Sequence, residues 1–524
     1  MVVHVDEDSL NSALAHIERL GDTDIFPRPF EVAAIRYCWD DLCPYLLRQD
    51  LDTYATRPLR RCMVPKGRYA YRIATQLDPL DAIIYAGLVH QIGSDLEAYR
   101  VPPDEEVVFS FRFQRSEEGR IFSPSYNWAA FQRRSAELAH EGPYTHIVVA
   151  DIADFFPRLY LHRIENTLQV ATSNTGPVRA IMKMLKQWND NVSYGLPVGS
   201  HASRLLAEVT INDIDRGLLS EKVTYCRYSD DFRIFCKSRR EAYERLESLA
   251  TKLEHNHGLS LQPGKTEIIG IDEFRRKYLT SLAAVELDSL RRRFEEIIGN
   301  LSFEDPYGVI DYDSLGGASK ALIDSLNLQE LLREQLGAVE IDVALFRFLL
   351  RRLGQLDNDQ MVDGLIDSIE TCYPVVPEVV RYLLALRTLH PARKTEIGHK
   401  ILALVQDSVI AHLPFHRCWL LSLFTEGDGW ECDQPGQLRS LLSSTREPTT
   451  ERKLVLGMGR AKSDYWFREM KSELMRFEAW TRRAFLAGAS CLPADERKHW
   501  FASVRSRLDP LEQAVVDWAK AHPF

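Results

Sequence analysis

Hydrophobic and polar positions follow two different periods along the chain. Up to about residue 282, short apolar runs of strand length alternate with longer stretches in which apolar residues recur at helical spacing. From residue 283 the strand-like runs largely disappear and the helical spacing continues to the C-terminus. A chain of 524 residues also exceeds what one hydrophobic core usually supports. We therefore predict an α+β domain over residues 1–282 and an all-α domain over residues 283–524.

The first 56 residues or so are predicted to form a helical lead-in. Two amphipathic patterns occur there, over residues 8–20 and 30–47. Ser9 near the start of the first pattern and Gly21 just past its end match the residue preferences at helix termini.

A basic stretch follows this lead-in. Its pattern around Gly67 predicts two strands joined by a tight turn. Lys66 and Arg72 would then lie on opposite arms of the hairpin, where both cations could bind a triphosphate. A solvated basic hairpin is the alternative. The cations of this stretch are Arg57, Arg60, Arg61, Lys66, Arg68 and Arg72.

Carboxylates stand at two predicted strand ends. Asp230 and Asp231 lie between two short runs of aromatic and apolar residues, a pattern typical of a β-hairpin with an acidic turn. The β-branched run His146–Asp151 predicts a buried strand that ends in a third carboxylate. Fixed carboxylates can form a cation site, whereas the Ser-Asp-Asp turn taken alone is also compatible with a solvated acidic turn.

Two further loops carry residues suited to ligand contact. Residues 195–200 open a predicted helix over about 201–219, and their glycines and proline let backbone approach a ligand at a helix N-terminus. After a predicted helix over 239–255, residues 258–268 form a loop and strand that present Lys265. Aromatic residues alternate with arginines over residues 107–134, which suits base stacking, with core packing as the alternative.

Composition narrows the class of protein. A content of 45% hydrophobic and 27% charged residues is that of an ordinary globular protein, and the net charge of −10 means that a polyanion would need a local basic patch. Nine cysteines without a Cys-x-x-Cys pair predict reduced thiols. The acidic N-terminus and the lack of an apolar run of bilayer length predict a cytoplasmic protein without a membrane partner.

The C-terminal half contains a faint internal repeat. An arginine followed by apolar residues recurs at intervals of 34, 36, 35 and 31 residues. This spacing predicts stacked helix pairs, as in α-solenoids. The repeated arginines are Arg347, Arg381, Arg417, Arg452 and Arg483.

Taken in order, the motifs of the first half resemble those of the reverse transcriptases. The resemblance extends from about Arg57 to Leu279 and implies the fingers and palm of a right-hand polymerase. It rests on Asp151-Ile-Ala-Asp-Phe-Phe-Pro, Gly195-Leu-Pro-Val-Gly-Ser, Tyr228-Ser-Asp-Asp and Gly258-Leu-Ser-Leu-Gln-Pro-Gly-Lys-Thr, which follow the basic hairpin in the family's order.

The resemblance implies roles for particular residues. Two Mg²⁺ or Mn²⁺ ions would be held by Asp151, Asp230 and Asp231, with Ile152 placed among the metal ligands. Lys265 would neutralise the departing pyrophosphate, and Phe156 matches the position that excludes a ribose 2′-OH, so the substrates would be dNTPs. The remaining substrate-binding positions are Lys66, Arg72, Gly199 and Ser200.

One departure points to a subgroup. Most templated reverse transcriptases have Pro-Gln-Gly where this chain has Pro197-Val198-Gly199. With the helical second half, this resembles the bacterial abortive-infection reverse transcriptases of the Abi type (AbiK-like). That resemblance implies antiviral defence, a HEAT-like repeat domain and homo-oligomers. It also implies untemplated DNA synthesis primed by a hydroxyl of the protein, with the single-stranded product attached covalently. The alternatives are a templated enzyme of the retron or group II intron type and a non-catalytic nucleic-acid-binding scaffold.

Overall fold

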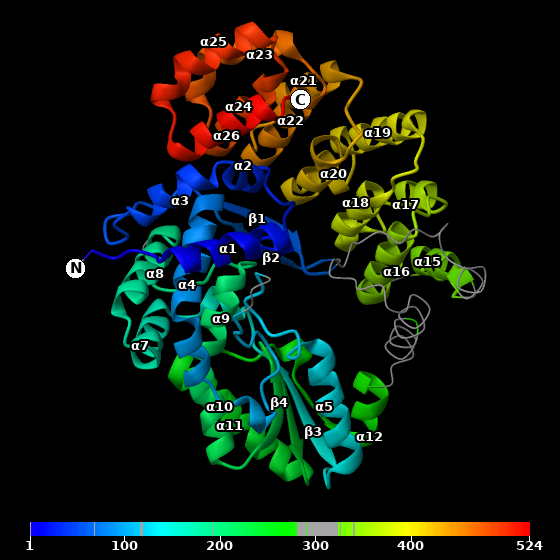
Figure 1. Cartoon of the computed structure of the whole chain (residues 1–524). Helices are drawn as coiled ribbons and strands as arrows, with labels where there is room; N and C mark the ends of the chain where they lie inside the picture. The colour runs from blue at the N-terminus through cyan, green and yellow to red at the C-terminus, as the bar shows by residue number, and fades with distance from the viewer. Residues whose placement is uncertain are drawn as a thin grey trace. The chain divides into compact units, whose positions relative to one another are not determined.

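The computed structural model describes residues 2–67, 69–115, 119–190, 192–279, 290, 323–324, 326–338 and 341–524 (Figure 1). The chain divides into two compact units. The first comprises Met1–Arg61 and Ala74–Ser281, and the second comprises Cys62–Ile73 and Leu282–Phe524. The predicted boundary at residues 282 and 283 lies outside the described residues. The basic hairpin segment, expected with the first domain, groups with the second unit.

The first unit combines helices with a small sheet. In chain order its elements are α1 (Glu7–Leu20), α2 (Glu31–Tyr37), α3 (Trp39–Leu47), α4 (Pro79–Tyr99), the short 3₁₀ turn η1 (Pro103–Glu105), α5 (Trp128–Glu141), β3 (His146–Asp151), α6 (Phe155–Arg158), α7 (Leu161–Ala171), α8 (Thr175–Trp188), α9 (His201–Thr210), α10 (Asn212–Ser220), β4 (Thr224–Tyr228), β5 (Asp231–Cys236), α11 (Arg239–His257), η2 (Pro263–Lys265), β6 (Glu267–Gly270), α12 (Ile271–Phe274) and the π-helical turn η3 (Arg275–Leu279).

An antiparallel four-stranded sheet in the order β4-β5-β3-β6 forms the centre of this unit. Side chains on one face, including Ile147 and Val149, join a buried cluster with Phe131 of α5. Helix α11 packs against β3 and β5. Because helices contact these strands and β3 is buried along nearly its whole length, the strand needs an almost continuous apolar run rather than an alternating one. The run His146–Asp151 was therefore correctly predicted as a buried strand.

Two of the predicted helices are broken. The pattern over residues 30–47 forms α2 and α3, separated at Cys38, and the pattern over 201–219 forms α9 and α10, separated at Ile211. Both single-helix predictions were wrong. Each break keeps apolar residues buried on both sides, so the hydrophobic period continues through the change of direction and does not reveal it.

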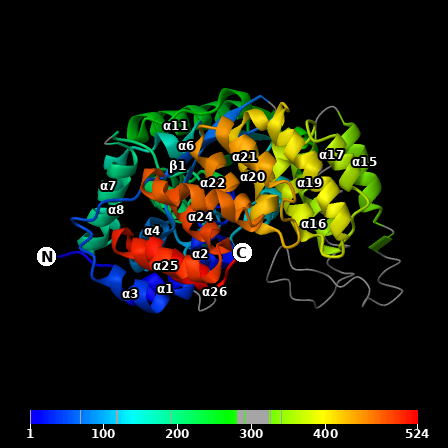
Figure 2. The ribbon, with the colours of Figure 1, turned by 90° about the horizontal axis from the view of Figure 1, so that it is seen from above.

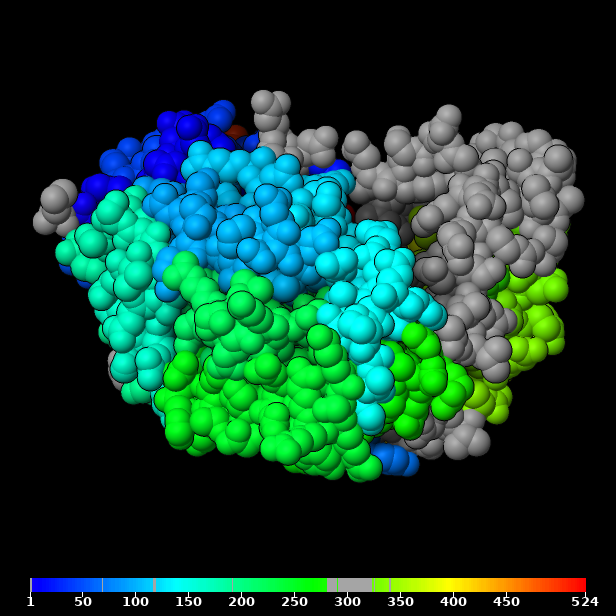
Figure 3. Space-filling view, turned by 90° about the horizontal axis from the view of Figure 1, so that it is seen from below, coloured from blue at the N-terminus to red at the C-terminus, as the bar shows by residue number. Residues whose placement is uncertain are grey.

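The surface of the first unit brings distant segments together. Helix α4 packs against α1, α8 and α9. In Figure 3 the light-blue atoms of α4 and the segment after it lie directly beside the green atoms that follow α9 in the chain. The predicted lead-in is therefore part of the unit's packed core, since α1 buries one face, including Leu10 and Ile17, against α4.

In the residues that the structure describes, the second unit is helical apart from its hairpin segment. The strands β1 (Arg60–Pro65) and β2 (Tyr71–Gln76) pair around Gly67, as predicted. The other elements are α15 (Leu328–Gly337), α16 (Val343–Gln355), α17 (Val362–Asp367), η5 (Tyr373–Val375), α18 (Val376–Ala385), α19 (Pro391–Gln406), η6 (Ile410–His412), α20 (Pro414–Glu426), α21 (Pro435–Ser444), α22 (Pro448–Arg460), α23 (Asp464–Met470), η7 (Lys471–Arg476), α24 (Ala479–Gly488), η8 (Ala489–Cys491), α25 (Ala494–Val504), η9 (Arg505–Arg507) and α26 (Pro510–Ala521).

Alternate helices of the second unit pack in series. Helix α16 contacts α18, α18 contacts α20, α20 contacts α22, α22 contacts α24, and α24 contacts α26. Figure 2 shows α20, α22 and α24 side by side along this series. The five repeated arginines fall on α16, α18, α20, α22 and α24, so the sequence interval marks the same helix of each successive pair.

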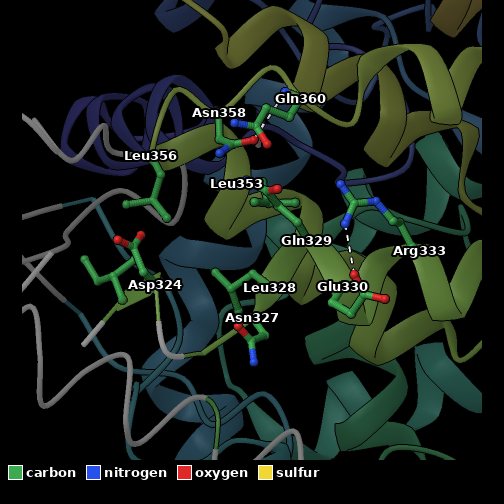
Figure 4. A pocket seen from close by; sticks show the side chains of 11 residues that line it. Asp324, Asn327, Leu328, Gln329, Glu330, Arg333, Leu353, Leu356, Asn358 and Gln360 are labelled. Atoms are coloured by element: carbon green, nitrogen blue, oxygen red, sulfur yellow. Dashed lines mark hydrogen bonds and ion pairs between the residues drawn. The ribbon is translucent and has the colours of Figure 1, made fainter. Parts of the chain in front are cut away.

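A pocket of about 480 Å³ lies beside α15 and α16 in the second unit (Figure 4). Asn327, Glu330 and Arg333 form part of its polar lining, and Leu353 part of its apolar lining. Arg333 is paired with Glu330 at 2.9 Å. The positive charge of Arg333 beside the pocket is therefore balanced by Glu330.

Other predictions about the chain concern its thiols and its hydropathy. All nine cysteines lie in the described residues, and each is a free thiol, as predicted. Among the helices that the structure describes, none has the length and apolar character needed to cross a bilayer.

Candidate active site

Three carboxylates gather at the same end of the two central strands. Asp151 is the last residue of β3 and Asp231 the first of β5, and the two are direct partners in the antiparallel register. The backbone carbonyl of Asp230 accepts a hydrogen bond from the N–H of Ile152 at 3.1 Å. The sheet thus brings the predicted residues Asp151, Asp230 and Asp231 together at the tip of the β4–β5 hairpin.

The turn that carries Asp230 has a strained backbone. Tyr228 pairs with Asp231, so only Ser229 and Asp230 connect the strands. Ser229 has a φ of 55°, in the left-handed region. Hairpin turns of this length require positive φ at the first central residue because of strand twist, and a residue other than glycine pays about 1 kcal/mol or more for it.

Lys265 reaches the carboxylates from the loop after α11. Its Nζ lies 2.6 Å from Asp151 Oδ2, although about half of its side chain is exposed. Partial burial alone would lower the pKa of Lys265, but the hydrogen bond and charge of Asp151, with the charges of Asp231 and Asp230, raise it above its ordinary value. The predicted catalytic lysine is therefore in the carboxylate cluster and is protonated at neutral pH.

The carboxylate cluster has the chemistry of a cation site. Asp151 Oδ1 is buried without a hydrogen-bond partner. Burial, followed by the charges of Asp230 and Asp151, raises the pKa of Asp231 to about 7. A divalent cation would coordinate Asp151 Oδ1. It would also offset the carboxylate repulsion that raises the pKa of Asp231. Within the part of the chain that the structure describes, no three His, Cys, Asp or Glu side chains form a ligand set by themselves. Since Mg²⁺ prefers octahedral coordination by oxygen, an ion bound here would need further oxygen ligands beside these carboxylates.

The glycine-rich loop before α9 is covered by the N-terminal segment. Gly199 has a φ of 116°, and a Cβ there would lie 2.6 Å from Thr23 Oγ1. Ser200 is fully buried and its Oγ donates to Asp22 Oδ1 at 2.9 Å. The sequence did not predict Asp22 and Thr23, and no signal in their own neighbourhood indicates that Asp22 contacts a serine 178 residues later.

Two buried histidines join the same loop to α1. His16 Nε2 lies 2.7 Å from His201 Nδ1, and His16 Nδ1 lies 3.0 Å from the carbonyl oxygen of Gly119. Burial lowers the pKa of His16 to about 4 and that of His201 well below its ordinary value. Both rings are therefore neutral, and one donates to the other.

Phe156 lies in α6, immediately after the strand that ends in Asp151. Its carbonyl accepts a hydrogen bond from Leu196 N at 2.9 Å, which holds it against the glycine-rich loop. Its ring is partly exposed and packs edge-on against Phe155. The proposed contact of this ring with a sugar stays a prediction.

Lys66 and Arg72 lie on the segment that groups with the second unit. Both side chains are exposed, and the turn between them is closed by a hydrogen bond from Lys66 N to the carbonyl of Ala70 at 2.8 Å. The hairpin thus has the predicted form. Triphosphate binding by its two cations stays a prediction.

Comparison with known proteins identifies one domain. Residues 65–281 match the family model described as "Reverse transcriptase (RNA-dependent DNA polymerase)", and these residues form a reverse transcriptase domain. No curated protein sequence matches the chain.

Two solved structures resemble the chain at low sequence identity. A telomerase from Candida albicans in complex with a fragment of telomeric RNA is 10% identical, with a TM-score of 0.31, over 71% of this chain and 69% of that one. A partial Cas6-RT-Cas1–Cas2 complex is 17% identical, with a TM-score of 0.24, over 48% of this chain. The match covers 42% of that chain's length.

Proposed function

We propose that this chain, through the reverse transcriptase domain of residues 65–281, is a metal-dependent DNA polymerase that transfers nucleotides from dNTPs. The observation that carries the proposal is the register of the central strands, which pairs Asp151 with Asp231 and places Asp230 beside Ile152. Carboxylates fixed on rigid strands suit nucleotidyl transfer, in which the protein mainly positions groups and stabilises charge.

The chain's own residues would hold two Mg²⁺ or Mn²⁺ ions. Asp151, Asp230 and Asp231 would supply carboxylate oxygens, and Ile152 would supply its backbone carbonyl. Two such ions would activate the attacking hydroxyl and stabilise the leaving pyrophosphate. Lys265, protonated beside Asp151, would neutralise or protonate the pyrophosphate.

The remaining predicted residues would bind the nucleotide. Lys66 and Arg72 on the exposed hairpin would bind the triphosphate, and Phe156 would exclude a 2′-OH. Ser200 is buried against Asp22, so we propose that it supports the loop containing Gly199 and that this loop's backbone faces the substrate.

We propose further that synthesis is untemplated and primed by the protein, in a bacterial cytoplasmic antiviral defence of the abortive-infection type. Most templated reverse transcriptases have glutamine where this chain has Val198, and this difference supports untemplated synthesis. The packing of alternate helices in the second unit supports a HEAT-like repeat domain. Homo-oligomers and a covalently attached single-stranded DNA product belong to the same proposal.

Asp230→Asn tests the core of this proposal. Because the amide is a poorer ligand for a hard cation, we expect dNTP incorporation to fall at least about a hundredfold in the purified variant, measured with labelled dNTPs and Mg²⁺ on a denaturing gel. Asp154→Asn is the matched control, since Asp154 is exposed, has positive φ that asparagine tolerates, and lies just after Asp151. Its activity should stay within about twofold of the wild type. Unchanged incorporation by Asp230→Asn contradicts the metal assignment.

The same assay separates the alternatives. Without template or primer, label that migrates with the protein supports protein priming. Product that appears only with a defined RNA, and is complementary to it, supports a templated enzyme of the retron or group II intron type. A wild-type protein that incorporates nothing under any condition, yet binds nucleic acid, supports the non-catalytic scaffold.

A further inference from the structure

A buried ionic network lies under the turn that carries Asp230. Arg227 of β4 is fully buried, and its Nε and Nη2 donate to the two oxygens of Asp215 at 2.9 and 2.6 Å. Its Nη1 lies 3.0 Å from Glu208 Oε2. Burial alone would lower the pKa of Arg227, but Asp215 and Glu208 raise it above its ordinary value. The arginine is therefore charged inside the protein.

A second arginine balances the charge. Arg100 Nη2 donates to Glu208 Oε2 at 2.8 Å and to the carbonyl of Ser110 at 2.9 Å. The Ser110 hydroxyl donates to Glu208 Oε1 at 2.6 Å. Arg100 also pairs with Glu97 at 3.2 Å, and Glu97 pairs with Arg112 at 2.8 Å. Equal numbers of arginines and carboxylates thus form a neutral network, and Ser110 is fixed by both its carbonyl and its hydroxyl.

Both backbone groups of Ser229 bond to this network. The carbonyl of Ser229 accepts from Arg227 Nη1 at 2.9 Å, and its N–H donates to Ser110 Oγ at 2.8 Å. Ser110 reaches the turn because the chain before it runs beside β4, with hydrogen bonds from Arg227 N to Val107 O at 2.7 Å and from Phe109 N to Arg227 O at 3.0 Å.

Stability is a poor explanation for this arrangement, because buried ion pairs often contribute no more than apolar residues of the same volume. The strained φ of Ser229, by contrast, persists only where the surroundings fix it. Asp230 and Asp231 are the next two residues. We propose that Ser110 and Arg227 are positioning residues that hold the backbone of Ser229 and thereby set Asp230 and Asp231 in the geometry that binds a divalent cation. This inference rests on the proposed function.

Ser110→Ala tests the inference in the full-length protein. It removes the acceptor of the Ser229 N–H without touching a carboxylate of the cluster. Groups that orient metal ligands are worth about 10- to 100-fold in metal affinity or activity. We therefore expect Mn²⁺ affinity, measured by electron paramagnetic resonance of free Mn²⁺, to fall about tenfold or more, and kcat for dNTP incorporation to fall similarly. The KM for dNTP should stay within about twofold, because nucleotide contacts are unchanged.

Two further variants separate positioning from general stability. Ser135→Ala is the matched control, since Ser135 is also fully buried but donates to the carbonyl of Phe131 within α5. It should leave Mn²⁺ affinity and kcat within about twofold of the wild type. Ser110→Thr keeps the hydroxyl and should restore Mn²⁺ affinity to within about threefold. If Ser110→Thr is as defective as Ser110→Ala while both melt like Ser135→Ala, the positioning role is overturned.

The two readouts distinguish the two proposals. If the wild type binds Mn²⁺ but incorporates no dNTP, the proposed polymerase function fails, and the loss of Mn²⁺ affinity in Ser110→Ala still decides the positioning role. If the wild type incorporates dNTPs and Ser110→Ala matches it in kcat and Mn²⁺ affinity, the positioning role fails alone. A wild type that binds no Mn²⁺ overturns both.

Discussion

At the scale of single residues, burial keeps the ring of His16 neutral where the N-terminal helix α1 packs. The pKa of His16 is about 4 in the folded protein, chiefly because of burial, against about 6.5 in an unfolded chain. The unfolded state therefore binds more protons between these values. The stability contributed by neutral His16 is complete above pH 6.5 and is lost as the pH falls toward 4.

We predict that His16→Gln changes the pH dependence of stability. The variant lacks the titrating ring, so the difference in unfolding free energy between wild type and variant should shrink by about 1 kcal/mol from pH 7.5 to 5.5. Differential scanning calorimetry should show this as a relative shift of roughly 2–4 °C in the transition of the first unit.

His140→Gln provides the control for this experiment. His140 lies at the exposed end of α5, where a replacement should change the free energy of unfolding by no more than about 0.5 kcal/mol. A gap between wild type and His16→Gln that does not change with pH would show that the His16 ring is not held neutral.

The sequence predicted the residues of the site where chemistry is concentrated in short motifs. Asp151, Asp230, Asp231 and Lys265 stand next to turn and strand signals, and the sheet brings them together. It did not predict Ser110, whose partner Ser229 is 119 positions away. In its local sequence Ser110 is an ordinary serine, and only the tertiary fold brings it to its partner.

At the scale of elements, the hydrophobic period predicted the helices α1 and α11, the central strand β3 and the helical character of the second half. It could not predict the breaks at Cys38 and Ile211, because buried apolar residues recur at helical spacing on both sides of each break. Nor could it predict how closely two helices approach, since that distance depends on the pair of residues facing each other at the crossing.

Gly459 illustrates such a crossing. A Cβ at this position of α22 would lie 2.4 Å from the Cα of Gly488 in α24, so the two backbones are in direct contact. We predict that Gly459→Ala destabilises the second unit by about 1–3 kcal/mol, because the helices must separate. Urea unfolding followed by circular dichroism measures the change.

Gly436→Ala is the control for that crossing. Nothing lies within 4 Å of a Cβ at Gly436, which is the second residue of α21. Here alanine should be neutral or stabilise the unit by up to about 1 kcal/mol, since it restricts the unfolded chain. Equal destabilisation by both variants would contradict the close contact of α22 and α24.

At the scale of the whole molecule, the chain leaves the first unit after Arg61 and returns to it at Ala74. The sequence could not predict this excursion. The residues that fix the hairpin segment to the helical unit are far away along the chain, as in the hydrogen bond of 2.8 Å between the hydroxyls of Tyr71 and Tyr373.

Tyr71→Phe tests this assignment of the hairpin. Loss of the hydroxyl should weaken local protection in the helical unit by about 0.5–1 kcal/mol, because the bond is solvent-exposed. Hydrogen exchange measured by mass spectrometry should show faster exchange in peptides around Tyr373 and no change in β3 and β5.

Tyr465→Phe, at an exposed tyrosine of the same unit, should leave the exchange around Tyr373 unchanged. Faster exchange confined to β3 and β5 in Tyr71→Phe would assign the hairpin to the first unit instead.

The excursion also has a consequence for synthesis on the ribosome. Tyr71 emerges 302 residues before the tyrosine that it bonds. At roughly 5–20 residues per second, the hairpin waits about 15–60 s for its partner helices. The first unit can collapse during that time, but the segment between Arg61 and Ala74 cannot reach its final environment until most of the chain has been made. Rapid translation of the intervening codons should therefore shorten the period in which this nascent chain is open to misfolding.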